Sequence, residues 1–190
     1  MSKNKNTESN DKIVKVIDNF LSEEDHSKLL ELFYHPSFPW FYSDKIISSE
    51  DNHFHFVHVL FDSNNLSVSR MFDDYAVKAL MKRINAKALI KVKANCTTRT
   101  ENIIKTDFHI DYPENFGSTT GIYYINSNNG YTFFEDGSKV ESVANRFICF
   151  PVGLKHAGTN CTDEKTRRVI NINYFHQCFY SIFIKHSADT

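Results

Sequence analysis

Residues 119–150 read TTGIYYINSNNGYTFFEDGSKVESVANRFICF. Three short runs in this stretch are rich in β-branched and aromatic side chains, which favour strands. The sequences SNNG (127–130) and EDGS (135–138) follow the first two runs, and Gly, Asn, Asp and Ser are typical of tight turns. The stretch therefore predicts short strands joined by turns. The expected strands are 119–126, 131–134 and 146–150.

Similar runs lie on both sides of this stretch, and helices are expected only before it. Ser22 is a suitable N-cap for a first helix, because the acidic sequence EED at 23–25 meets the positive end of the helix dipole. Pro36 ends that helix. A second amphipathic helix is expected from about 69 to 86. The further expected strands are 12–20, 53–61, 88–94, 103–111 and 169–179.

Helices followed by many short strands indicate an α+β protein dominated by β-structure, in which a sandwich or barrel carries the site. A jelly roll, or double-stranded β-helix, brings strands that are distant in sequence side by side. We therefore expect a jelly roll with flanking N-terminal helices. Polar residues 1–12 are expected to form a disordered tail. Residues 13–190 are expected to form a single domain, since no linker, repeat or composition shift divides them.

The composition and charge of the chain indicate neither a nucleic-acid partner nor a membrane. The formal net charge is −1, which gives no bulk electrostatic attraction for nucleic acid or an anionic membrane. No run approaches the ~18 apolar residues that span a bilayer, and the N-terminus lacks the apolar core of a secretory signal. The four cysteines show no Cys-x-x-Cys spacing, so neither a zinc knuckle nor a disulfide framework is indicated. We expect a cytoplasmic protein.

Three residues form a candidate metal site. His109 and Asp111 are two positions apart, so on a strand they project from one face. His156 lies in a turn-rich segment (151–158) between two expected strands, where functional side chains often lie. Two imidazoles and one carboxylate on one side of a metal leave open positions. That set suits non-haem Fe(II), which must also bind O2 and a cosubstrate. A His-x-Asp pair alone is also common on solvated strand edges.

The segment TRRVININYF (166–175) carries a second candidate group. Alternation places Arg167, Asn171 and Asn173 on one face and Arg168 on the other. Polar side chains that point into a barrel are costly unless something polar fills the cavity, and a bound dicarboxylate would satisfy them. Arg167 would offer that carboxylate a fixed positive fork. The alternative is that this face is simply exposed to solvent.

Five segments occur in a familiar order: FHID (108–111), IYYIN (122–126), NGYTFFEDG (129–137), RFICFPVGLKHAG (146–158) and TRRVININYF (166–175). Together they resemble the prolyl 4-hydroxylase-like branch of the Fe(II)/2-oxoglutarate-dependent oxygenases. The likeness runs from about residue 89 to 179, which would be the catalytic core, and several motifs in order are far more specific than His-x-Asp alone.

The resemblance implies a role for each matching residue. The implied iron ligands are His109, Asp111 and His156. Arg167 matches the basic residue that pairs with the distal carboxylate of 2-oxoglutarate. Arg168 competes for that role, but Arg167 is preferred because it puts polar Asn171 four residues on, where relatives carry a threonine.

Two more positions match residues near the cosubstrate. Tyr124 matches a strand tyrosine whose hydroxyl reaches the same carboxylate in some relatives, and Thr132 matches a small polar position. Asn173 departs from the pattern, because relatives often have tryptophan there. Because of this departure, the resemblance does not predict the shape of the pocket around Asn173.

The implied function is Fe(II)- and 2-oxoglutarate-dependent hydroxylation of a C–H bond with O2 as cosubstrate and ascorbate as an optional reductant. Prolyl residues in a peptide or protein are the expected substrate. Another side chain or a small molecule is the alternative, and segments 95–107 and 112–118 are expected to set the choice. The chain also resembles short, Asn- and Lys-rich members encoded by bacteriophages.

Three other interpretations compete with this one. His53 and His55 form a His-x-His pair of the kind seen in cupins, but no glutamate follows at the expected distance, so we interpret them as strand residues. A jelly roll that has lost turnover and only binds is a second alternative. A Zn(II) hydrolase is the third, and it would give Arg167 no obvious task.

Overall fold

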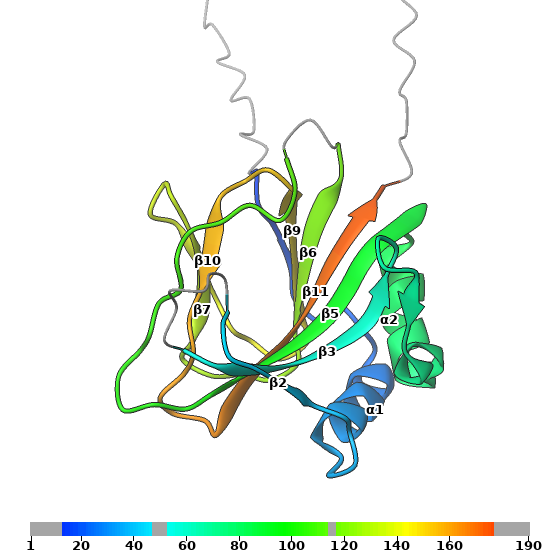
Figure 1. Cartoon of the computed structure of the whole chain (residues 1–190), viewed down its shortest axis with the longest axis horizontal. Helices are drawn as coiled ribbons and strands as arrows, with labels where there is room; N and C mark the ends of the chain where they lie inside the picture. The colour runs from blue at the N-terminus through cyan, green and yellow to red at the C-terminus, as the bar shows by residue number, and fades with distance from the viewer. Residues whose placement is uncertain (1–12, 47–52, 114–116, 177–190) are drawn as a thin grey trace, which may run out of the picture.

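The computed structural model describes residues 13–46, 53–113 and 117–176, and its dominant elements are antiparallel strands (Figure 1). The helical elements are α1 (Glu23–Tyr34), the 3-10 turn η1 (Arg70–Asp73) and α2 (Tyr75–Ile84). The strands are β1 (Lys15–Ile17), β2 (Phe41–Ser43), β3 (His55–Asp62), β4 (Ser67–Val68), β5 (Ala88–Thr98), β6 (Thr119–Tyr124), β7 (Tyr131–Phe134), β8 (Lys139–Glu141), β9 (Arg146–Pro151), β10 (His156–Gly158) and β11 (Thr166–Phe175).

The strands form two sheets. The larger sheet has the order β1-β9-β6-β11-β5-β3-β2, with β4 paired to β3, and the smaller sheet has the order β10-β7-β8. Figure 1 shows β7 and β10 on the side of the larger sheet that faces away from the helices. This is the predicted β-dominated jelly roll with flanking N-terminal helices, and the structure confirms that prediction.

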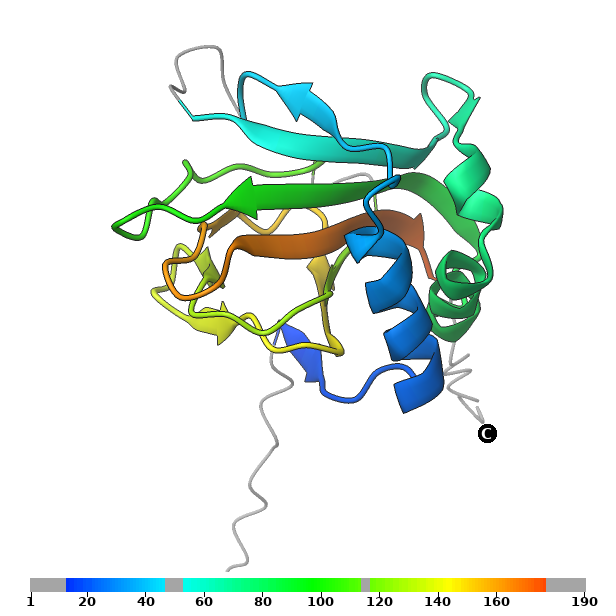
Figure 2. The same cartoon turned by 90° about the horizontal axis from the view of Figure 1, so that it is seen from below.

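Alternation along the strands divides the interior into two parts. Ile170 and Ile172 of β11 pack with apolar residues of α1 and α2, on the face that the helices cover (Figure 2). Val169, one position away, packs with Phe134 and Phe150 between the two sheets. Because the strand period is two, the other residues of β11 with odd numbers also face this space between the sheets. That space holds the candidate site.

Some expected elements are wrong. Residues 103–111 do not form a strand. Their β-bridges, Lys105–Thr159 and His109–His156, are isolated, and side-chain hydrogen bonds join Ile104 to Asn160 and Thr106 to Gly158. The expected helix 69–86 is divided, because Asp74 has an extended ψ of 142° and its side chain accepts a hydrogen bond from the Ala76 amide, so that α2 begins after it.

Other differences concern the ends of elements. The opening strand is shorter than 12–20, and part of the segment expected to be turn-rich forms β10. The strand expected at 88–94 continues to Thr98. The predicted tail at 1–12 and the last part of the expected strand 169–179 lie outside the described residues. No helix in the described part of the chain is long and apolar enough to cross a bilayer.

Candidate metal and cosubstrate site

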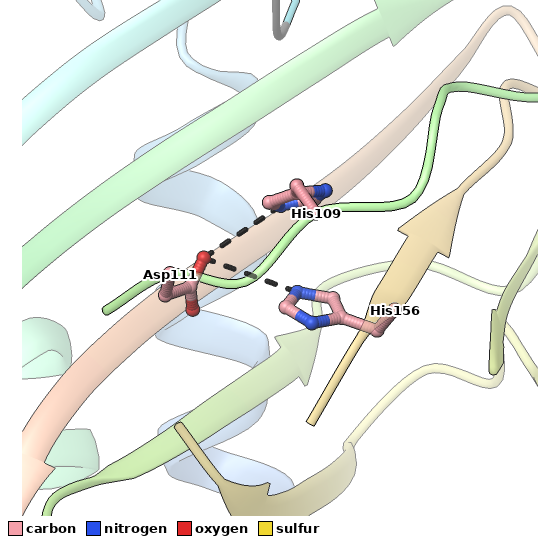
Figure 3. Close-up of side chains that lie close together, drawn as sticks. All are labelled: His109, Asp111 and His156. Carbon is pink, nitrogen blue, oxygen red and sulfur yellow. Dashed lines mark ion pairs between the residues drawn. The ribbon is translucent and has the colours of Figure 1, made fainter. Parts of the chain in front are cut away.

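His109, Asp111 and His156 lie together between the two sheets (Figure 3). His156 is the first residue of β10, whereas the other two belong to the loop between β5 and β6. The backbones of His109 and His156 pair directly, with both N–H···O distances at 3.0 Å. This pairing fixes the distance between two residues that are far apart in the sequence.

The side chains of these three residues converge. One ligand atom from each lies within 4.8 Å of the others. Asp111 Oδ1 is 3.6 Å from His109 Nε2 and 3.9 Å from His156 Nε2, as the dashed lines in Figure 3 show. Among the described residues, this is the single group of three or more such side chains close enough to hold a metal ion.

The histidines present the nitrogen that a metal needs. His156 Nδ1 donates to the carbonyl of Leu154 over 3.0 Å, which leaves the lone pair on Nε2. That Nε2 atom is buried and has no hydrogen-bond partner among the described residues. Burial lowers the pKa of His109, and the neighbouring His156 lowers it further. Since metals bind the neutral imidazole, both features fit a ligand set for an ion such as Fe(II).

The second oxygen of Asp111 is held by two donors. Thr120 Oγ1 donates to Asp111 Oδ2 over 2.7 Å, and Asn173 Nδ2 donates to the same atom over 2.8 Å. Oδ1 is thereby turned toward the histidines. Thr120 was not among the predicted site residues, although it shares a face of β6 with Tyr124, and alternation from Tyr124 could have identified it.

Arg167, Tyr124 and Thr132 also lie together, as their predicted roles require. Arg167 is buried and donates from Nε to Ser142 Oγ over 2.8 Å and from Nη2 to Thr132 Oγ1 over 3.3 Å. Tyr124 donates its hydroxyl to the same Thr132 oxygen over 2.8 Å. Ser142 was not predicted, and no local pattern in the sequence marks it.

The charge of Arg167 has no counterion within the described residues, because no carboxylate lies within ion-pair distance of its guanidinium. Burial lowers the pKa of Arg167, but a guanidinium starts so high that it stays protonated. A buried cation without an anion is costly. The site is therefore suited to an anionic ligand.

Arg168 lies on the opposite face of β11. Its guanidinium is 3.7 Å from the centre of the Tyr34 ring, and it donates to the carbonyl of Phe33. It therefore contacts α1 and not the space between the sheets. The alternative that the face with Arg167 is merely exposed to solvent is wrong, because Arg167 and Asn173 are both buried.

One cavity connects the histidines with the arginine. Its volume is about 100 Å³. The polar residues on its wall include His109, His156, Thr132, Arg167, Asn171 and Lys93. A small ligand could thus contact the His-Asp-His cluster at one point and Arg167 at another.

Two other histidines, His55 and His58, belong to β3. His58 bonds through Nδ1 to the carbonyl of Pro39 and through Nε2 to Ser69 Oγ, each over 2.7 Å. His55 begins β3 and lines the cavity, outside the three-residue cluster. The interpretation of His55 as a strand residue agrees with this position, whereas the same interpretation of His53 is wrong, because His53 precedes β3.

Comparison with known proteins gives a clear result for the fold. No protein-family model and no curated protein matches the sequence. Among solved structures, a prolyl hydroxylase from Trichoplax adhaerens, in complex with a hypoxia inducible factor oxygen degradation domain peptide fragment, superposes with a TM-score of 0.56 and 15% identity, over 87% of this chain and 84% of that chain.

Two further structures are similar. A viral collagen prolyl hydroxylase from Paramecium Bursaria Chlorella virus-1 has a TM-score of 0.56 and 12% identity, over 92% of this chain and 97% of that chain. The non-heme alpha ketoglutarate dependent epimerase SnoN from nogalamycin biosynthesis has a TM-score of 0.57 and 14% identity, over 85% and 76%. This chain therefore has the fold of the 2-oxoglutarate- and Fe(II)-dependent oxygenases, as its resemblance predicted.

Proposed function

We propose that this protein is an Fe(II)- and 2-oxoglutarate-dependent dioxygenase that hydroxylates a C–H bond, with prolyl residues of a peptide or protein as its substrate. One observation carries the proposal. The cluster of His109, Asp111 and His156 shares a cavity with the buried Arg167, whose charge has no counterion among the described residues. A metal site with open positions beside an anion site is the arrangement that a keto acid cosubstrate requires.

The three cluster residues would hold the iron. Bound Fe(II) supplies the chemistry that uses O2 to convert 2-oxoglutarate to succinate and CO2 and places the second oxygen atom on the substrate carbon. The contribution of the protein is geometric. Thr120 and Asn173 fix one oxygen of Asp111, and the Leu154 carbonyl fixes the ring of His156.

Arg167 would orient the cosubstrate. Its guanidinium can donate two parallel hydrogen bonds to the distal carboxylate, and such charge-assisted bonds contribute about 1.5–3 kcal/mol. Tyr124 and Thr132 would direct hydroxyl groups to the same carboxylate. Ser142 holds Nε of Arg167 and thereby restricts the side chain before the ligand arrives.

The choice of prolyl residues as the substrate is supported by the similarity to solved structures. Two of the similar structures described above are named as prolyl hydroxylases, whereas SnoN is named as an epimerase from nogalamycin biosynthesis. A small-molecule substrate or another side chain is therefore the alternative. The carboxylate of Asp111 favours hydroxylation over halogenation, which needs an open position where this ligand stands.

The proposal is tested by supplying Fe(II), 2-oxoglutarate, O2 and ascorbate together with a set of proline-containing peptides. Mass spectrometry would detect the gain of one oxygen atom, and succinate release would report turnover. His109→Ala is the matched inactive variant. Hydroxylated peptide and equimolar succinate are expected from the wild type alone. Hydrolysis that needs neither O2 nor 2-oxoglutarate would instead support the Zn(II) enzyme.

A further inference from the structure

Strand β5 has one apolar face and one polar face. Its buried residues Val92 and Ala94 pack in the core that the helices cover. Lys91, Lys93 and Asn95 alternate with them and therefore project from the other face. Of the two lysines, only Lys93 lines the cavity that contains the His-Asp-His cluster.

The two lysines differ in their partners. Lys91 Nζ lies 3.1 Å from Asp62 Oδ2, so its charge is neutralised by a buried carboxylate. For Lys93 Nζ, the described residues provide neither an ion pair nor a hydrogen bond. Burial lowers the pKa of Lys93, as does Lys91, while Asp111 raises it. An ammonium group that is partly removed from water without a partner is unfavourable unless a ligand provides one.

Lys93 lies beside the metal cluster and away from Arg167. It lines the same cavity as His109 and His156, and the nearby carboxylate of Asp111 raises the pKa of Lys93. In the β5–β11 pairing, Lys93 lies opposite Asn171, whereas Arg167 lies opposite Thr97. The two pairs are four residues apart along β11, so their backbone positions are separated by about 13 Å. Lys93 and Arg167 therefore serve different parts of the cavity.

Asn171 adds a second unsatisfied group at the same place. Its Oδ1 atom is buried and has no hydrogen-bond partner among the described residues. The orientation of a terminal amide follows its partners, so a ligand could receive a hydrogen bond from this side chain. Lys93 and Asn171 together present an ammonium and an amide to one point of the cavity wall.

We propose that Lys93 and Asn171 form a subsite for a carboxylate of the primary substrate, so that the oxidised C–H bond belongs to an amino acid or peptide whose carboxylate lies close to it. This inference rests on the proposed function and specifies the substrate of that site. An α-carboxylate at the end of the chain and the side-chain carboxylate of an acidic neighbour share the same chemistry. The experiment distinguishes them.

The probes are matched pairs that differ only in charge. N-acetyl-L-proline is compared with N-acetyl-L-prolinamide, and Ac-Ala-Pro-Glu-NH2 with Ac-Ala-Pro-Gln-NH2. Calorimetry measures their binding to the anaerobic protein loaded with Fe(II) and 2-oxoglutarate, and also to the metal-free protein. The variants are Lys93→Gln and Lys93→Arg. Lys78→Gln is the control, because it removes an exposed lysine of α2 that is paired with Asp73.

The wild type and K78Q should bind the acidic member of at least one pair about tenfold to a hundredfold more tightly than the neutral member, as expected for a hydrogen bond to a charged group. The first pair reports an α-carboxylate and the second a side-chain carboxylate. K93Q should remove the preference, and K93R should retain part of it. The affinity of K93Q for 2-oxoglutarate should stay within about threefold of that of the wild type.

Three results would overturn the subsite. The first is that the wild type binds both members of each pair equally or binds neither. The second is that K93Q keeps the preference for the acidic member. The third is that K93Q loses much of its affinity for 2-oxoglutarate, which would make Lys93 a cosubstrate ligand. Failure of the oxygenase proposal looks different. In that case 2-oxoglutarate would not bind to the wild type, while binding of the probe pairs to the metal-free protein would still show whether Lys93 prefers the acidic member.

Discussion

The side-chain amide of Asn173 donates from Nδ2 to Oδ2 of Asp111 over 2.8 Å, and it also lies 3.1 Å from Thr120 Oγ1, which donates to the same carboxylate oxygen. Asp111 therefore has one oxygen held by the protein and one directed to the histidines. Asn173, where the sequence departs from the family that it resembles, thus helps to orient Asp111, a proposed metal ligand.

Removal of this amide should weaken metal binding. Residues that orient a ligand typically contribute a factor of 10–100 to metal affinity, so Asn173→Ala should lower affinity by about tenfold or more. Competition titrations with Co(II) or Zn(II), without 2-oxoglutarate, measure the effect. Asn171→Ala is the matched control, because Asn171 lies on the same face of β11 and makes no hydrogen bond to Asp111. Equal losses in both variants would contradict the role of Asn173.

The two neighbouring arginines should have separable effects. Arg167→Gln should raise the dissociation constant of 2-oxoglutarate by about tenfold to a hundredfold and leave metal affinity unchanged, because a charge-assisted fork is lost. Calorimetric titration of 2-oxoglutarate into the anaerobic Fe(II) protein measures this. Arg167→Lys keeps the charge without the fork and should give an intermediate value.

Arg168→Gln is the counterpart on the other face of the strand. It removes the contact with the Tyr34 ring and the hydrogen bond to the Phe33 carbonyl. The free energy of unfolding should fall by about 1–2 kcal/mol, and 2-oxoglutarate affinity should not change. The assignment of Arg167 would be wrong if the two variants exchanged these effects.

Gly130 should be intolerant of a side chain for a reason that concerns Arg167. A Cβ atom at Gly130 would lie 2.7 Å from Arg167 Cδ and would also overlap the carbonyl oxygen of Asn160. Gly130→Ala should therefore displace Arg167, destabilise the fold by about 1–3 kcal/mol and weaken 2-oxoglutarate binding more than metal binding. Gly137→Ala serves as a control, since a Cβ there meets no atom within 4 Å, although its positive φ adds local strain.

Asp62 should make stability depend on pH. Burial would raise the pKa of Asp62, but hydrogen bonds from Lys91 and Asn65 outweigh burial and hold the pKa below its usual value. The unfolded chain therefore takes up the proton first as the pH falls. The stabilisation is complete above about pH 4 and is lost as the pH falls through the folded-state pKa.

Asp62→Asn should accordingly lower the free energy of unfolding by about 1–3 kcal/mol at neutral pH. Its difference from the wild type should shrink below about pH 4. Urea unfolding of both proteins at several pH values measures this difference. A difference that stays constant down to low pH would show that the charge of Asp62 contributes nothing.

Alternation was sufficient where a strand has two different faces. It placed Arg167, Asn171 and Asn173 together and Arg168 apart, because the period of a strand is fixed by backbone geometry. It misled at 103–111, where apolar residues such as Phe108 and Ile110 resemble a strand but remain 43% exposed in the structure. A pattern of apolar residues does not report whether pairing with a neighbouring segment is continuous, and here the segment 156–159 forms isolated bridges in place of a ladder.

Tertiary contacts explain what remained hidden in the sequence. Thr120, Ser142 and Lys93 matter because of the strand or loop that the fold places opposite them, and no local motif encodes that neighbour. The backbone pairing of His109 with His156 is likewise a product of the jelly roll. The resemblance predicted that these residues meet, and the structure supplies the contact that brings them together.

The proposed pairing of iron with 2-oxoglutarate can be observed in a single spectrum. The protein is mixed with Fe(II) and 2-oxoglutarate without oxygen, and the visible absorbance is recorded. We expect a metal-to-ligand charge-transfer band that is absent in His109→Ala and that requires higher 2-oxoglutarate concentrations in Arg167→Gln. A wild-type protein that is folded by circular dichroism yet shows no such band at saturating Fe(II) and 2-oxoglutarate would contradict the proposed oxygenase site.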